Sequence, residues 1–184
     1  MIHWKSLLKE ALSTVLIAAL IATVIKIFIV DNRIVPSSSM YPTIYVGDML
    51  LVNKTAYYFN DPQRGDIVVF KPEKEIGQKD LVKRVIGLPG ETVVVQENKV
   101  FIDKKALNED YLDEPPQYDF GPVKVPSDCL FVLGDNRNMS YDSHQWSNPF
   151  ISIKSVKGKV FFRYWPLDRM GRMKEVRYEN PSDQ

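Results

Sequence analysis

Cysteine and histidine are scarce in this sequence, which has one cysteine, Cys129, and two histidines, His3 and His144, among 184 residues. A single cysteine cannot form an internal disulfide, so packing must stabilise the fold in any redox compartment. These residues are also too few for a dedicated zinc site, and we expect no metal or other cofactor. Lys and Arg total 24 against 23 Asp and Glu, so no excess of positive charge indicates a nucleic-acid partner.

One long apolar run, residues 11–30, is interrupted only by Lys26. As a helix rising about 1.5 Å per residue, it would span roughly 30 Å, the thickness of a bilayer core. A cleavable secretory signal is one alternative, but its apolar region is shorter, and this run continues into Asp31-Asn32-Arg33 instead of a small-x-small cleavage site. A buried core helix is the other alternative. We predict a retained transmembrane anchor in the lipid bilayer.

Charges beside the apolar run indicate its orientation. Lys5 and Lys9 precede it and favour a cytoplasmic N-terminus, although Arg33 just after it reduces the asymmetry. We therefore predict a single-pass membrane protein with its larger part outside the cytoplasm.

The anchor divides the chain into three predicted parts. Residues 1–10 are expected to form a cytoplasmic N-terminus, 11–30 the anchor, and 31–184 one extracytoplasmic domain. Within this domain, residues 104–126 are rich in Asp, Glu, Pro and Tyr, and we expect an excursion or a small subdomain there.

Short β-branched runs separated by turn residues recur after the anchor, with no long amphipathic helix between them. This pattern predicts a mainly β fold of coiled antiparallel sheets or a partial barrel. The predicted strands are 49–52, 66–70, 81–86, 92–95, 100–102, 130–133 and 160–164.

Three consecutive serines, Ser37 to Ser39, lie between Pro36 and Pro42 shortly after the anchor. Prolines on both sides would hold a hydroxyl in a fixed direction near the membrane surface, as a nucleophile requires. Serine is also a common loop residue, so a juxtamembrane linker is the alternative interpretation.

A serine nucleophile needs a base, and two routes are open. His144 follows Asp142 by two positions, so a triad of Ser39, His144 and Asp142 is conceivable. Lys83 is the other candidate, because its apolar strand would desolvate the amine and lower its pKa. An exposed strand lysine is the alternative reading of this segment.

Several blocks of the sequence, in this order and spacing, resemble the bacterial type I signal peptidases, also called leader peptidases. The resemblance extends from the anchor to at least Ser143. The blocks are Pro36-Ser37-Ser38-Ser39-Met40-Tyr41-Pro42-Thr43, Gly47-Asp48, Arg64-Gly65-Asp66-Ile67-Val68-Val69-Phe70, Lys83-Arg84-Val85-Ile86-Gly87-Leu88-Pro89-Gly90-Glu91 and Gly134-Asp135-Asn136-Arg137-Asn138-Met139-Ser140-Tyr141-Asp142-Ser143.

The resemblance implies a serine endopeptidase with a Ser-Lys dyad. Ser39 then matches the nucleophile, Lys83 the general base and Ser37 a hydroxyl that stabilises the oxyanion. Ser140 matches a serine that orients the lysine, and Asp142 a supporting carboxylate.

His144 departs from the family pattern, which usually has arginine at this position, paired with the aspartate. A pair of His144 and Asp142 would work best with a protonated imidazole, which would make activity more sensitive to pH.

The resemblance also implies the substrates, which are secretory preproteins cut after a small-x-small motif. The peptide would bind in an extended form alongside a strand, with Val35 and Val82 as walls of shallow pockets. Ordinary core packing is the alternative role for these two valines.

Other functions fit the sequence less well. Penicillin-recognising hydrolases use Ser-x-x-Lys, but Pro42 stands three residues after Ser39. A self-cleaving repressor-type protease would need a DNA-binding segment where the anchor stands. The non-enzymatic alternative is a membrane-tethered β-domain that binds peptides without catalysis.

Overall fold

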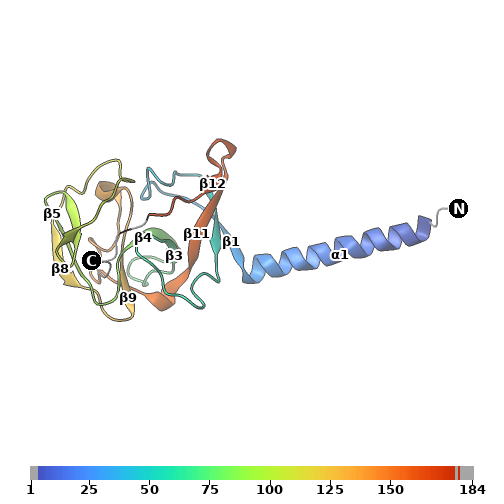
Figure 1. Cartoon of the computed structure of the whole chain (residues 1–184), viewed down its shortest axis with the longest axis horizontal. Helices are drawn as coiled ribbons and strands as arrows, with labels where there is room; N and C mark the ends of the chain where they lie inside the picture. Colours follow the sequence, from blue (N-terminus) through green and yellow to red (C-terminus); the bar gives the residue numbers. More distant parts are fainter. Residues whose placement is uncertain (1–3, 177, 179–184) are drawn as a thin grey trace.

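The computed structural model describes residues 4–176 and 178 of the chain. Figure 1 shows one long helix, α1 (Trp4–Phe28), extending away from a domain built of strands. Residues Leu7–Phe28 of this helix are long and apolar enough to cross a membrane, and none of their most apolar window is buried against the domain. His3 lies outside the described residues.

The larger sheet is antiparallel and has the strand order β1-β2-β11-β3-β4-β9-β10, with β12 paired to β11. It is an open path, because β1 and β10 stand at opposite ends of it. Its strands are β1 (Val30–Ile34), β2 (Met49–Asn53), β3 (Ile67–Phe70), β4 (Leu81–Gly87), β9 (Cys129–Leu133), β10 (Ile151–Ser152), β11 (Val156–Trp165) and β12 (Gly171–Arg172).

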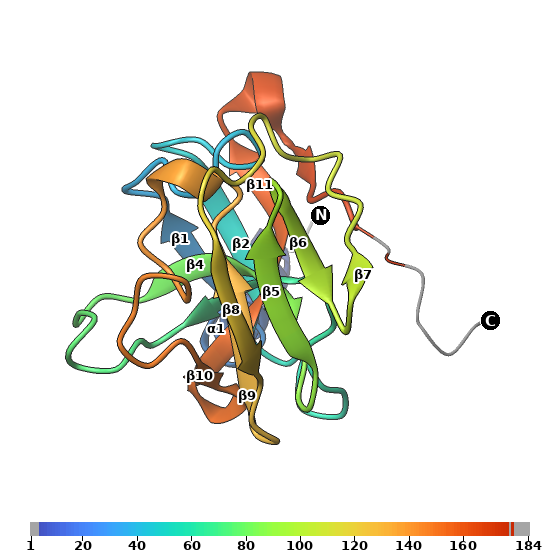
Figure 2. The same cartoon turned by 90° about the vertical axis from the view of Figure 1, so that its left-hand side faces the viewer.

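A smaller antiparallel sheet has the order β7-β6-β5-β8 and stands in front in Figure 2. Its strands are β5 (Thr92–Gln96), β6 (Lys99–Ile102), β7 (Lys105–Ala106) and β8 (Phe120–Lys124). Short 3-10 helices complete the domain: η1 (Arg137–Met139), η2 (Ile153–Ser155) and η3 (Leu167–Arg169).

Buried β-branched and aromatic side chains explain why these segments are strands. All four residues of β3 are buried, because this strand lies between β11 and β4. The alternating burial of β5 follows the period of two that a half-buried strand requires. One core cluster lies under the serine loop and includes Met40, Ile44 and Leu50.

The predicted mainly β fold of coiled antiparallel sheets, preceded by one helix, is confirmed. Each predicted strand is present, with bounds shifted by a few residues at most for six of them, whereas β11 is longer than predicted. The sequence pattern did not predict β1, whose polar residues occur where we expected only a connection. This strand forms because it pairs with β2, from Val30 opposite Asn53 to Ile34 opposite Met49.

Candidate active site

The serine loop connects β1 to β2. It is held in place by packing of Met40 into the core and by hydrogen bonds from Asn136. Met40, next to Ser39, is 1% exposed and belongs to the core cluster beneath the loop. Asn136 donates its backbone N–H to the Ser39 carbonyl (3.0 Å) and its side-chain amide to the Ser38 carbonyl (3.2 Å). The loop is therefore a fixed support for the Ser39 hydroxyl and not a free linker.

Lys83 lies on β4, opposite Val68 of β3, and is only 3% exposed. Its ammonium Nζ donates a hydrogen bond of 2.8 Å to Ser140 Oγ. Burial lowers the pKa of Lys83 to about 8, although the negative charges of Asp142 and Asp135 oppose this shift. An amine with this pKa is partly neutral near physiological pH and can accept a proton.

One cavity of about 310 Å³ is lined by both residues of the proposed dyad, Ser39 and Lys83. Ser37 also lines it, with its Oγ 3.4 Å from Ser39 Oγ. Val35 and Val82 line the same cavity; Val35 belongs to the core cluster below the loop, and Val82 packs against that cluster. The structure thus brings together five residues that come from two separate parts of the sequence.

Asp142 stands behind the lysine and is completely buried. One carboxylate oxygen accepts the Gly134 N–H (2.8 Å), and the other lies 2.7 Å from His144 Nδ1. The His144 ring stacks on Tyr118 with 3.9 Å between ring centroids. Within the described part of the chain, Lys83 lines the cavity that contains Ser39 and His144 does not, so the geometry favours the lysine over the triad alternative.

Gly134, the residue after β9, stands where the serine loop and Ser140 meet. A Cβ atom there would clash with the Ser39 carbonyl oxygen and with the Ser140 side chain. Glycine is therefore required by close packing, because only a residue without a side chain lets Ser39 and Ser140 approach the same point.

A buried ion pair that we did not predict supports this region from the other face of β4. Arg84 is 1% exposed and binds Asp135 through two hydrogen bonds of 2.8 and 2.6 Å. Arg137 is similarly paired with Glu109, which belongs to the predicted excursion 104–126. The sequence block Gly134-Asp135-Asn136-Arg137 indicated the site. It could not indicate the two ion pairs, because the partners of Asp135 and Arg137 are distant in sequence.

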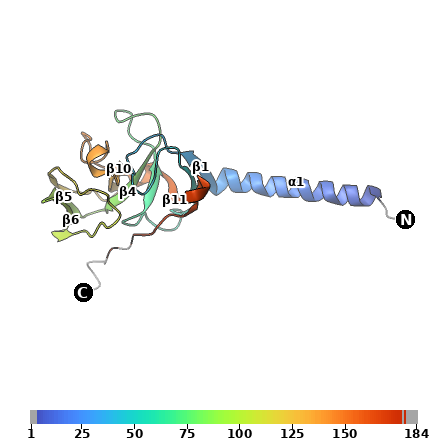
Figure 3. The ribbon, with the colours of Figure 1, turned by 90° about the horizontal axis from the view of Figure 1, so that it is seen from above.

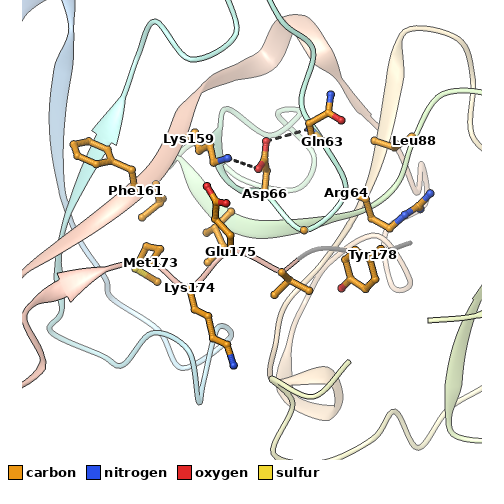
Figure 4. A pocket seen from close by; sticks show the side chains of 14 residues that line it. Gln63, Arg64, Asp66, Leu88, Lys159, Phe161, Met173, Lys174, Glu175 and Tyr178 are labelled. Carbon is orange, nitrogen blue, oxygen red and sulfur yellow. Dashed lines mark hydrogen bonds and ion pairs between the residues drawn. The ribbon is translucent and has the colours of Figure 1, made fainter. Parts of the chain in front are cut away.

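A larger cavity, about 390 Å³ in volume, lies between the start of β3, β11 and the C-terminal segment (Figure 4). Its Lys159 and Asp66 form an ion pair of 2.6 Å across the cavity wall. Neither Ser39 nor Lys83 lines it. We therefore assign the candidate active site to the smaller cavity.

A serine and a buried, hydrogen-bonded lysine that line one cavity are the groups that a serine hydrolase with a lysine base requires. Residues 8–165 match the family model described as signal peptidase, peptidase S26, and the chain belongs to this family. Together with this family, the exposed apolar helix α1 fits a membrane-anchored protein.

Named relatives cover most of the chain. A signal peptidase I of Leptolyngbya laminosa is 44% identical over 90% of this chain and 84% of its own length. A signal peptidase I P of Bacillus subtilis subsp. natto is 37% identical over 92% of this chain and 96% of its own. A crystal structure of a signal peptidase I from Enterococcus faecalis V583 has 35% sequence identity, covers 54% of this chain and 97% of that chain, and gives a TM-score of 0.48.

Proposed function

We propose that this chain is a membrane-anchored serine endopeptidase that removes signal peptides from exported preproteins, with Ser39 as nucleophile and Lys83 as general base. Membership of the signal peptidase family supports the reaction. The observation that supports the residue roles is the shared cavity, which joins an accessible serine loop to a buried lysine with a lowered pKa. The alternative of a peptide-binding β-domain without catalysis does not explain why a lysine is buried there.

The reaction proceeds in two halves. The neutral Lys83 amine takes the Ser39 hydroxyl proton while Ser39 Oγ forms a bond to the scissile carbonyl carbon. The resulting lysine ammonium then returns the proton to the departing amine as the carbon–nitrogen bond breaks, which leaves an acyl-enzyme. In the second half, Lys83 takes a proton from water, the hydroxide attacks the ester, and Ser39 regains its proton as the signal peptide leaves.

Ser37 would stabilise the oxyanion together with the Ser39 amide. Its hydroxyl lies 3.4 Å from Ser39 Oγ, so it can reach an oxygen that develops beside the attacked carbon. Such a donor contributes about 3 to 4 kcal/mol to transition-state stability in acyl-transfer enzymes.

Ser140 and Asp142 would position the lysine. Ser140 accepts the Lys83 hydrogen bond, which fixes the direction of the amine, and its place is secured by the close packing at Gly134. Asp142 is buried near the lysine and acts on it through charge, while Gly134 and His144 hold the carboxylate.

Small residues at the first and third positions before the cut would fit the cavity. Val35 is 5% exposed, and it and Val82 place branched side chains in the cavity wall, where they would restrict the size of the substrate side chains beside them. These walls would select substrates by steric exclusion, as the small-x-small motif requires.

The domain would lie outside the cytoplasm, with α1 crossing the lipid bilayer from a cytoplasmic N-terminus. Lys9 before the apolar run supports this orientation. Because α1 ends at Phe28 and β1 begins at Val30, the serine loop follows the bilayer closely. The chain offers no charge excess to favour a nucleic-acid partner.

A cleavage assay with the full chain in detergent tests the proposal. A preprotein with a small-x-small site should be cut, and Ser39→Ala and Lys83→Ala should each abolish cutting. Matched controls are Ser147→Ala and Lys99→Ala, which change exposed residues that line neither cavity. Thermal melts verify folding. Full activity of Lys83→Ala would overturn the dyad, and an uncut preprotein would favour the peptide-binding alternative.

A further inference from the structure

The cavity that contains Ser39 and Lys83 is called the first cavity below. A second cavity, about 230 Å³ in volume and separate from the 390 Å³ cavity of Figure 4, adjoins the serine loop. Tyr41, Asn136 and Met139 line it. Tyr41 follows the nucleophile by two residues, and Asn136 holds the Ser39 carbonyl by a hydrogen bond of 3.0 Å. Met139 is 75% exposed and lines this cavity and the one that contains Ser39 and Lys83. The two cavities are therefore neighbours, separated at the serine loop.

A peptide substrate needs room on both sides of the attacked carbonyl. Val35 and Val82 line the first cavity, which takes the residues before the cut. The residues after the cut must then leave across the serine loop, and the second cavity is the space there that shares Met139 with the first. Its volume suits one side chain of the leaving peptide.

The second cavity carries uncompensated negative charge. Two of its wall residues are neutralised by ion pairs with partners that do not line the cavity. Asp135 pairs with Arg84, and Arg137 pairs with Glu109. The walls therefore gain no net charge from these two residues.

Asp113 and Glu114 complete the second cavity, and both are exposed. Neither forms an ion pair within the described part of the chain, and Glu114 accepts only a neutral amide hydrogen bond from Asn138 (3.2 Å). The charge of Asp113 acts within the cavity, since it is the main cause that raises the pKa of Tyr41. A cation placed here would meet two carboxylates.

We propose that this second cavity binds the first residues of the mature protein after the cut, and that Asp113 and Glu114 make it prefer cationic over acidic side chains there. The inference rests on the proposed function and adds a specificity to the same site. The new amino terminus, which is protonated after cleavage, is formed at this side of Ser39 and meets the same negative field.

Peptide substrates that share one small-x-small site test the inference. They carry Lys, Gln or Asp at the first or second position after the cut, and kcat/KM is measured with the full chain in detergent. At about 50 mM salt we expect Lys to exceed Asp by about tenfold at one of these positions, falling to about twofold in 0.5 M salt because screening weakens exposed charges.

The double variant Asp113→Asn/Glu114→Gln should lower the Lys-to-Asp ratio to about twofold or less at low salt. The control Glu97→Gln/Asp128→Asn removes two exposed carboxylates that line neither cavity, and it should keep the wild-type ratio. A ratio near one in the wild type, or an unchanged ratio in the Asp113/Glu114 variant, would overturn the inference. Failure to cut even the Gln peptide would instead reject the proposed function.

Discussion

Lys83 combines two properties that oppose each other, burial and a charge that burial disfavours. Moving its pKa from 10.5 to about 8 costs about 3 kcal/mol in the protonated state, at about 1.4 kcal/mol per pKa unit. The strand cannot relieve this cost, because Lys83 is paired with Val68 of β3 and its amine is directed at Ser140. The fold therefore accepts an unfavourable protonated Lys83, and in the proposed reaction the neutral amine serves as the base.

The pH dependence of cleavage should follow this lysine. The amine accepts a proton only when neutral, so kcat/KM should rise about tenfold per pH unit at low pH and level off above about pH 8. A profile measured on a neutral peptide from about pH 6 to 9 checks this. A flat profile across that range would contradict the role of Lys83 as base.

Lys83→Met should abolish cleavage and stabilise the fold. Because the folded-state pKa is lowered, the unfolded chain binds more protons between about pH 8 and 10.5, and the destabilisation by Lys83 is complete below that window and lost above it. The variant should gain about 2 to 3 kcal/mol of unfolding free energy near pH 6, and less as the pH approaches 10.5.

Denaturant unfolding of the two proteins at several pH values measures this difference. Lys79→Met serves as the control, since Lys79 is exposed and should show no such gain. A less stable Lys83→Met protein at neutral pH would mean that the buried amine stabilises the fold.

At the scale of elements, the block of residues 134–144 after β9 is contacted by the connection between β7 and β8 of the smaller sheet. Tyr118, just before β8, stacks on His144, which in turn contacts the buried Asp142. Glu109, after β7, binds Arg137 of η1. Residues 104–126 therefore contact the block of residues 134–144 at two points, Tyr118 and Glu109.

His144→Arg should change the pH dependence in a defined direction. An imidazole carries its charge only at mildly acidic pH, whereas a guanidinium keeps it throughout the range of the assay. The kcat/KM of the variant relative to wild type should therefore increase by about twofold to tenfold between about pH 6 and 8. An unchanged ratio across the range would show that charge on residue 144 does not support Asp142.

At the scale of the whole molecule, α1 and the β domain are joined end to end, as seen from above in Figure 3. The backbone N–H of Lys54, after β2, donates to the Ile29 carbonyl (2.8 Å), and the Lys54 amine binds the Ile27 carbonyl at the helix end. The most apolar window within Leu7–Phe28 of the helix is not buried against the domain. The domain core therefore does not depend on the helix for its packing.

A chain that begins at Ile29 should fold and cut a short peptide within about threefold of the full chain, because the core clusters lack helix residues. Cleavage of a preprotein in liposomes should fall by about tenfold or more, since the anchor raises the local concentration of enzyme at the membrane. Both rates are measured side by side. Equal liposome rates for the two chains would reject a role for α1 in tethering.

Much of this architecture was predictable from local patterns. The apolar run 11–30 predicted the helix because hydropathy is a property of consecutive residues, and β-branched runs predicted the central strands. The ordered blocks around Ser39, Lys83 and Gly134 indicated the family, which the family model confirmed. Polar β1 could not be predicted, since its pairing with β2 outweighs its own weak strand preference.

The sequence by itself determined the family, the helix and the positions of seven strands along the chain, all of which depend on neighbouring residues. Only the tertiary structure decided that Lys83 is buried and not an exposed strand lysine, because the residues around its amine, Ser140 among them, are distant in sequence. It also decided that His144 contacts Asp142 away from Ser39, and that Asp113 lies beside the serine loop. These contacts join residues far apart in sequence, and no local pattern specifies which distant side chains will meet.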